Sequence, residues 1–139
     1  MTQLLITGGA GFIGSHACLA FLQAGYSLVV LDNYSNGSLH ALRRVAQLAG
    51  IEENTERLKL VDGDIRSARD LDKAFLLGSK SIDAVVHFAG LKAVGESFEM
   101  PLSYWDVNVT GSISLLEAMT RHSCWTMVFS SSATVYGYP

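Results

Sequence analysis

Three features of the sequence predict a layered α/β domain with a parallel sheet: short apolar runs, longer helical segments between them, and polar or glycine residues where the runs end. The apolar runs, taken as five strands, are residues 4–7, 28–31, 58–61, 84–88 and 126–129. Runs this short and without a polar face are typical of strands buried on both sides of a sheet. Strands that alternate with helices favour parallel pairing through right-handed crossovers.

Four segments between these runs are predicted to be helices, and residues that start or stop helices stand at their ends. The segments are 12–24, 39–49, 70–77 and about 102–120. Ser38 is a candidate N-cap of the second helix, and Pro101 occupies the first turn of the fourth. Gly25, Gly50 and Gly78 follow the first three helices, where glycine readily takes the conformation that ends a helix.

The glycine-rich segment 7–14, Thr-Gly-Gly-Ala-Gly-Phe-Ile-Gly, joins the first strand to the first helix. Gly8 permits the tight turn, Gly11 lets the backbone approach a diphosphate, and Gly14 lets the helix pack closely on the sheet. The helix N-terminus then offers free N–H groups to phosphate oxygens. The segment therefore predicts a dinucleotide-binding, doubly wound sheet of the Rossmann type, with strand order 3-2-1-4-5 and the turn at the switch point between strands one and four.

Asp32 supports this interpretation from the end of the second strand. It lies 18 residues after Gly14, close to the spacing expected for the acid that binds an adenosine ribose. A carboxylate there accepts hydrogen bonds from both ribose hydroxyls and repels a 2′-phosphate. No arginine follows it directly, so the sequence favours NAD over NADP.

The composition indicates one soluble domain spanning residues 1–139. Its hydrophobic fraction of 49% and charged fraction of 17% suit a globular chain, and the net charge of −3 argues against nucleic acid or an anionic membrane as a partner. Cys18 and Cys124 have no neighbours at metal-ligand spacing, so we expect free buried thiols and no metal site. Neither a signal peptide nor a membrane span is evident, so we expect a cytoplasmic protein.

Five stretches make the sequence similar, over its whole length, to the extended short-chain dehydrogenase/reductase family. They are residues 7–16, 32–36, 63–66, 87–97 and 129–137. Within that family the chain most resembles the UDP-glucose 4-epimerases. The first and third stretches are shared widely across the family. The fourth, His-Phe-Ala-Gly-Leu-Lys-Ala-Val-Gly-Glu-Ser, and the fifth, Phe-Ser-Ser-Ser-Ala-Thr-Val-Tyr-Gly, are much more specific to the epimerases.

The resemblance implies a cofactor role for each matched residue. Along the diphosphate it places Gly8, Gly11, Phe12, Ile13 and Gly14, and around the adenosine ribose Asp32, Asn33, Tyr34, Ser35, Asn36 and Gly37. Against the adenine it places Asp64 and Ile65, and on the nicotinamide side Phe88, Ala89, Gly90, Leu91 and Lys92, with Asn108 as a further polar contact. Ser132 becomes the catalytic serine, which hydrogen-bonds the sugar hydroxyl that is oxidised.

The activity implied is interconversion of UDP-glucose and UDP-galactose, in galactose metabolism, through a 4-keto sugar. In this family the base is a tyrosine with a lysine four positions later. Here the fourth positions after Tyr26, Tyr34 and Tyr104 hold other residues, and those after Tyr136 and Tyr138 lie beyond the sequence. We therefore expect an amino-terminal part of such an enzyme, truncated before the last strands and the substrate-binding part, inactive alone and homodimeric at full length.

Two alternatives remain open on the sequence. A nucleotide-sugar dehydratase or decarboxylase of the same family would keep the glycine turn, Asp32 and Asp64, but differ around residues 91–97. A non-catalytic NAD-binding or redox-sensing module would need the turn and Asp32 but no serine at Ser132. The presence of Ser132 in its full context favours the enzyme.

Overall fold

One parallel sheet forms the centre of the protein. The computed structural model describes residues 2–52 and 54–137. Within these residues five strands pair side by side in the order β3-β2-β1-β4-β5, all parallel. The strand order and the Rossmann-type topology predicted from the sequence are confirmed. The domain limits predicted at 1 and 139 lie outside the described residues.

The strands and helices lie close to the ranges that the sequence predicts. The strands are β1 (Gln3–Thr7), β2 (Ser27–Asp32), β3 (Leu58–Asp62), β4 (Ala84–His87) and β5 (Met127–Phe129). The α-helices are α1 (Phe12–Gln23), α2 (Leu39–Ala49), α3 (Ala68–Leu77), α4 (Val94–Glu99), α5 (Pro101–Trp105) and α6 (Gly111–Arg121). A π-helical turn, η1 (Asp106–Thr110), joins α5 to α6, and a 3₁₀-helix, η2 (Ala133–Tyr136), follows β5.

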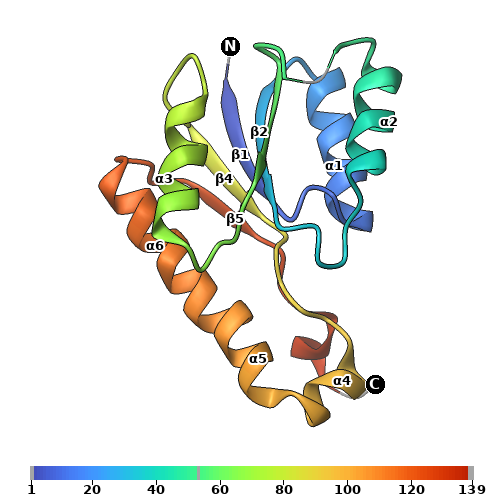
Figure 1. The fold of residues 1–139 in the computed structure, drawn as a ribbon, viewed down its shortest axis with the longest axis vertical. Coiled ribbons are helices and arrows are strands. Elements are labelled where there is room, and N and C mark those ends of the chain that lie inside the picture. The colour runs from blue at the N-terminus through green and yellow to red at the C-terminus, as the bar shows by residue number, and fades with distance from the viewer. Residues whose placement is uncertain (1, 53, 138–139) are drawn as a thin grey trace.

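Helices cover both faces of the sheet, α1 and α2 one face and α3 and α6 the other (Figure 1). Successive side chains of a strand point to opposite faces, so each central strand contributes to both layers. On β1, for example, Leu5 packs with Leu71 of α3 and Leu115 of α6, whereas Ile6 packs with Cys18 of α1 and Leu42 of α2. This two-sided burial is why the strands read as continuous apolar runs.

The structure corrects the helix predictions in three places. α3 begins at Ala68 rather than at 70, because the Ser67 side chain caps it by accepting the Asp70 N–H. α4 was not predicted. The segment expected as one regular helix from 102 to 120 contains the π turn η1, where the Ser112 hydroxyl donates to the Asn108 carbonyl.

Both cysteines are buried free thiols, as predicted. Burial, with a smaller contribution from Asp32, raises the pKa of the Cys18 thiol to about 12, so the group stays protonated and acts as an apolar side chain. Among the described residues, no helix combines the length and the apolar composition needed to cross a bilayer.

One histidine lies inside the sheet, at the carboxyl end of β4. His87 is 2% exposed, and its ring nitrogens are hydrogen-bonded to the hydroxyls of Thr7 and Ser112. Burial, assisted by the nearby charge of Lys92, lowers the pKa of His87 from 6.5 to about 4. The native sheet therefore holds a neutral imidazole at neutral pH.

We predict a loss of stability on mild acidification. Between pH 6.5 and about 4 the unfolded chain binds a proton at His87 that the folded chain does not. The contribution of neutral His87 to the free energy of unfolding is therefore fully present above pH 6.5 and is lost as the pH falls toward 4. At pH 5 it should be about 2 kcal/mol lower than at pH 7, as measured by urea denaturation.

Two histidine variants separate this effect from general acid sensitivity. His87→Gln, which cannot titrate, should be less stable at pH 7 but lose much less stability between pH 7 and pH 5. The exposed His40 of α2 supplies the matched control. In His40→Gln the free energy of unfolding should decrease between pH 7 and pH 5 by as much as in the unaltered chain. If the unaltered chain and His87→Gln lost equal stability between pH 7 and pH 5, His87 would not be the group responsible.

Candidate functional site

A cleft of about 720 Å³ opens at the carboxyl ends of the strands, where the segments that follow β1 and β4 separate. This volume lies within the range of small-molecule sites, and the position is the switch point at which doubly wound sheets bind ligands. Most of the predicted cofactor residues line it: Gly8, Gly11, Phe12, Ile13, Gly14, Asp32, Asn33, Ser35, Asn36, Gly37, Asp64, Ile65, Phe88, Ala89, Gly90, Leu91 and Lys92. Four stretches of chain thus meet in one cavity.

The glycine turn forms the floor of the cleft through very close backbone contacts. Gly8 has a φ of +70°, and a Cβ there would lie 2.6 Å from the Ala89 nitrogen beyond β4. A Cβ on Gly14 would lie 2.2 Å from the Gly8 carbonyl oxygen. No side chain larger than hydrogen fits at either position, so the turn, the start of α1 and the end of β4 are held together by their backbones.

The N-terminus of α1 opens into this cleft without a cap of its own. Gly11 occupies the N-cap position and has no side chain that could accept the first N–H groups, and the first turn carries no acidic residue. Phe12 and Ile13 line the cleft although they are 83% and 54% exposed. The helix end therefore presents unsatisfied donors and an apolar surface, which together suit an anionic group joined to flat rings.

Asp32 is fixed at the end of β2 by backbone donors. Its carboxylate is only 9% exposed and accepts the N–H groups of Ala10 at 2.9 Å and Tyr34 at 2.8 Å. These two bonds leave further lone pairs on both oxygens for a ligand in the cleft. The acid predicted from its spacing thus lies in the cleft with its orientation set.

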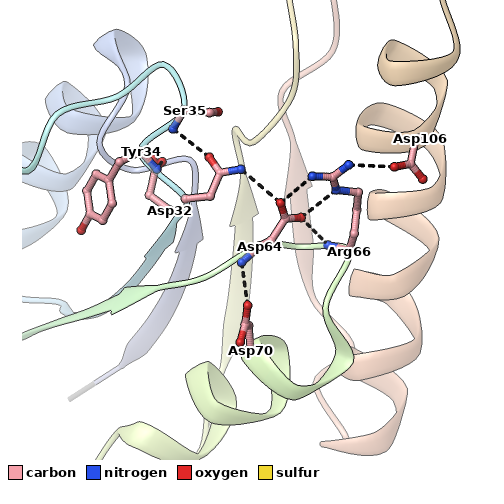
Figure 2. A network of polar contacts seen from close by, with 8 residues as sticks. Asp32, Tyr34, Ser35, Asp64, Arg66, Asp70 and Asp106 are labelled. Carbon is pink, nitrogen blue, oxygen red and sulfur yellow. Dashed lines mark hydrogen bonds and ion pairs between the residues drawn. The ribbon is translucent and has the colours of Figure 1, made fainter.

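A second carboxylate, Asp64, joins the loop after β3 to the loop after β2 along the cleft lining (Figure 2). Arg66 donates to both of its oxygens, from Nε at 3.0 Å and from Nη2 at 2.8 Å, and Asn33 donates from Nδ2 at 3.1 Å. The hydrogen bonds from Arg66 are the main cause that lowers the pKa of Asp64 to about 2. Asp64 is therefore charged at any ordinary pH.

Arg66 also reaches the helical segment that contributes Ser103 and Val107 to the cleft lining. Its Nη1 donates to the Asp106 carboxylate of η1 at 2.7 Å, so one guanidinium bridges the loop after β3 and the π turn (Figure 2). The two carboxylates raise the pKa of Arg66, which keeps the bridge charged. All three side chains are partly exposed, so the bridge orients the wall of the cleft more than it stabilises the fold.

The sequence prediction missed several residues of the cleft. They are Leu31, Gly63, Arg66, Ser103 and Val107. Arg66 belongs to a motif stretch and follows Asp64 by two positions, which could have indicated a pair. Nothing in the sequence indicates its pairing with Asp106, forty residues away.

Two predicted cofactor residues, Tyr34 and Asn108, do not line the cleft but form hydrogen bonds to residues that do. The Tyr34 ring packs against the core on the α1 and α2 side, turned away from Asp64 and Arg66 (Figure 2), while its backbone N–H serves Asp32. Asn108 binds the backbone of Leu91 at two points: Oδ1 accepts the N–H at 2.8 Å, and Nδ2 donates to the carbonyl at 2.9 Å. Both residues therefore shape groups that line the cavity.

Ser132 lies outside the cavity lining in the described chain. It is exposed after β5, where its Oγ accepts the Thr134 N–H at 3.2 Å and caps η2. The segment before it starts near the cleft, since the Ser130 N–H donates to the His87 carbonyl at the end of β4. The catalytic role of Ser132 stays a prediction.

Comparison with known proteins places this cleft in a family. The family model described as GDP-mannose 4,6 dehydratase matches residues 5–139. UDP-glucose 4-epimerase 2 of Arabidopsis thaliana is 54% identical over 137 residues, which are 99% of this chain and 38% of that protein. The chain therefore spans about 38% of the length of this curated relative.

Solved structures agree with the sequence comparison. UDP-glucose 4-epimerase of Stenotrophomonas maltophila, with bound NAD and formylated UDP-arabinopyranose, superposes with a TM-score of 0.90 at 42% identity, covering 100% of this chain and 39% of that one. The enzyme of Bifidobacterium longum, in complex with NAD⁺ and UDP, gives a TM-score of 0.90 at 45% identity, covering 99% and 39%. The resemblance to UDP-glucose 4-epimerases inferred from the motifs is confirmed. Because the family model matches nearly every residue, the chain belongs to the GDP-mannose 4,6 dehydratase family.

Proposed function

We propose that this chain is the NAD-binding part of a UDP-hexose 4-epimerase that interconverts UDP-glucose and UDP-galactose. The observation that carries the proposal is the convergence, in one cleft, of the uncapped start of α1, the fixed carboxylate of Asp32 and residues 88–92. Two of the solved epimerases that match this chain were crystallised with NAD, which supports the same ligand here.

The residues of the cleft fit a dinucleotide from one end to the other. The first N–H groups of α1 would bind the diphosphate, because a helix N-terminus carries partial positive charge. Asp32 would accept hydrogen bonds from the adenosine ribose hydroxyls, and its negative charge would repel the 2′-phosphate of NADP. Ile65 and the wall built by Asp64 and Arg66 would receive the adenine.

Bound NAD supplies the acceptance and return of a hydride at C4 of the sugar. Residues 88–92 would fix the orientation of the nicotinamide end, and Lys92 would reach its ribose. The Ser132 hydroxyl would donate a hydrogen bond to the sugar oxygen once it turns toward the cleft. The 139 residues contain no Tyr-x-x-x-Lys pair, so we propose that a base supplied from outside this sequence completes the site.

A dehydratase is the second candidate, favoured by the description of the family model. Both reactions would use the same cleft for NAD, so binding alone does not separate them. The product does, because a dehydratase releases water and leaves a deoxy-keto sugar, whereas an epimerase returns a hexose of unchanged composition.

We further propose that the whole protein acts in galactose metabolism in the cytoplasm and forms a homodimer. Support for self-association comes from large apolar side chains exposed on the α4 to α6 segment. Phe98 and Leu102 are each 83% exposed, and Trp105 is 65% exposed. Apolar groups gathered on one segment are typical of surfaces that become buried in an assembly.

The first prediction of this proposal concerns Asp32. Calorimetry should show NAD binding more tightly than NADP, and Asp32→Ala should weaken NAD binding by roughly 1.5–3 kcal/mol through lost charge-assisted hydrogen bonds. Asp62, an exposed acid at the end of the neighbouring β3, is the matched control, and Asp62→Ala should leave the affinity unchanged. Equal affinity for the two dinucleotides would count against the ribose assignment.

The second prediction concerns the floor of the cleft. In Gly14→Ala the new Cβ would lie 2.2 Å from the Gly8 oxygen, so α1 must move away from the turn. NAD affinity should fall more than tenfold, and stability by about 1–3 kcal/mol, the usual range for overpacking. A Cβ on Gly95 of α4 would meet nothing within 4 Å, so Gly95→Ala should leave the affinity unchanged and should not lower stability. An unchanged affinity in Gly14→Ala would show that close packing at this turn is not required.

The third prediction concerns catalysis. This chain alone, supplied with NAD and UDP-galactose, should yield no detectable UDP-glucose. A longer protein that contains it together with a Tyr-x-x-x-Lys pair should be active, and Ser132→Ala should reduce its kcat by about 10²-fold or more. Comparable turnover by the short chain would refute the proposed source of the base.

A further inference from the structure

Five buried or half-buried side-chain and backbone groups, joined by four hydrogen bonds, form a continuous chain behind the nicotinamide end of the cleft. The Ala89 N–H bonds to the Thr7 hydroxyl, Thr7 to Nδ1 of His87, Nε2 of His87 to the Ser112 hydroxyl, and Ser112 to the Asn108 carbonyl. The chain runs from β1 through β4 to α6 and ends on η1. One end of this chain is the backbone of Ala89, a lining residue, and the other end is Asn108, whose side chain binds the lining residue Leu91.

The direction of every hydrogen in this chain is determined by its last member. A carbonyl only accepts, so Ser112 must donate its single hydrogen to Asn108, at 2.6 Å. Ser112 can then only accept from His87, at 3.2 Å, which puts the imidazole hydrogen on Nε2. Nδ1 is left as an acceptor for the Thr7 hydroxyl, and Thr7 in turn accepts the Ala89 N–H at 3.3 Å.

The same serine lies beside the π turn that places Asn108. A serine that donates to the carbonyl four residues earlier perturbs the regular helical ladder, and π turns widen a helix by one residue. Asn108 stands within this turn, where its side chain binds both backbone groups of Leu91. His87, through Ser112, is thereby linked to the residue that holds Leu91, a lining residue of the cleft.

We propose that His87 is a positioning residue for the nicotinamide end of the cleft, acting as a neutral Nε2–H imidazole through Ser112 and Asn108. Its Nε2–H fixes the Ser112 hydroxyl, which bonds to the main-chain carbonyl of Asn108, and the side-chain amide of Asn108 holds Leu91. Its Nδ1 orients the Thr7 hydroxyl, which holds the Ala89 N–H, so both contacts are in place before any ligand arrives. Residues 88–92 then need little rearrangement when the dinucleotide binds, which favours affinity. This inference rests on the proposed binding of NAD.

Ser112→Ala tests the link without altering the imidazole or the cleft lining. Thr120→Ala is the matched control, because Thr120 on the same helix makes the same kind of bond, to the Leu116 carbonyl at 3.0 Å. Thr120 is exposed and does not line the cleft. Calorimetry with NAD should give an affinity roughly five- to twentyfold lower for Ser112→Ala, and an unchanged affinity for Thr120→Ala.

Nuclear magnetic resonance of the same variants tests the hydrogen-bond chain directly, in the absence of any ligand. In the unaltered chain the ¹⁵N shifts of His87 should show a protonated Nε2 and an unprotonated Nδ1. Hydrogen exchange at the Leu91 amide should be faster in Ser112→Ala and unchanged in Thr120→Ala. An Nδ1–H tautomer, or Leu91 exchange that Ser112→Ala leaves unaltered, would overturn the proposal even if the variant lost overall stability.

The outcomes also separate this inference from the proposed function. If the unaltered chain binds NAD and Ser112→Ala binds it equally well, the positioning role is refuted and the cofactor assignment stands. If the unaltered chain fails to bind NAD, the cofactor assignment is refuted, and the positioning role with it.

Discussion

The close approach of two backbones at the switch point governs the rest of the structure. Between Gly8 and Ala89 there is no room for a Cβ, and between Gly14 and the Gly8 carbonyl there is less still. This contact determines where α1 starts, how close α1 lies to the sheet and where β4 ends. A cleft large enough for a dinucleotide opens beside the contact because β1 and β4 send their following segments to opposite faces.

The two carboxylates that line the cleft, Asp32 and Asp64, each have fixed partners. Asp32 is held by two backbone N–H groups, and Asp64 by Arg66 and Asn33. Fixed dipoles and charges need little reorganisation when a ligand binds, which is the usual source of affinity in a pre-formed site. The exposed Arg66–Asp106 pair adds little to folding stability, yet it joins the loop after β3 to η1.

The helical layer that carries α5, η1 and α6 contributes to the cleft by a different means. Its π turn directs the Asn108 amide onto the backbone of Leu91, and the buried His87 connects this turn to the end of β1. A regular helix over the same residues would rotate Asn108 relative to residues 88–92. An irregularity in one helix thus helps to shape the cleft, as π turns often do at functional sites.

The sequence by itself determined the order of strands and helices, the Rossmann-type topology and the identity of most cleft residues. The strand order, the topology and the position of Asp32 follow from short-range rules: apolar runs bury strands, caps end helices, and the spacing from Gly14 to Asp32 comes from one strand–helix–strand unit. Most of the other cleft residues were identified through the motifs that the sequence shares with the extended short-chain dehydrogenase/reductase family. Only the tertiary structure decided the pairing of Arg66 with Asp106, the π turn at 106–110 and the packing of the Tyr34 ring against the core. Each of these depends on contacts between segments far apart in the chain, or on one side-chain bond shifting a helical ladder. Local propensity and spacing carry no information about such contacts, because the partners are brought together only by the folded sheet.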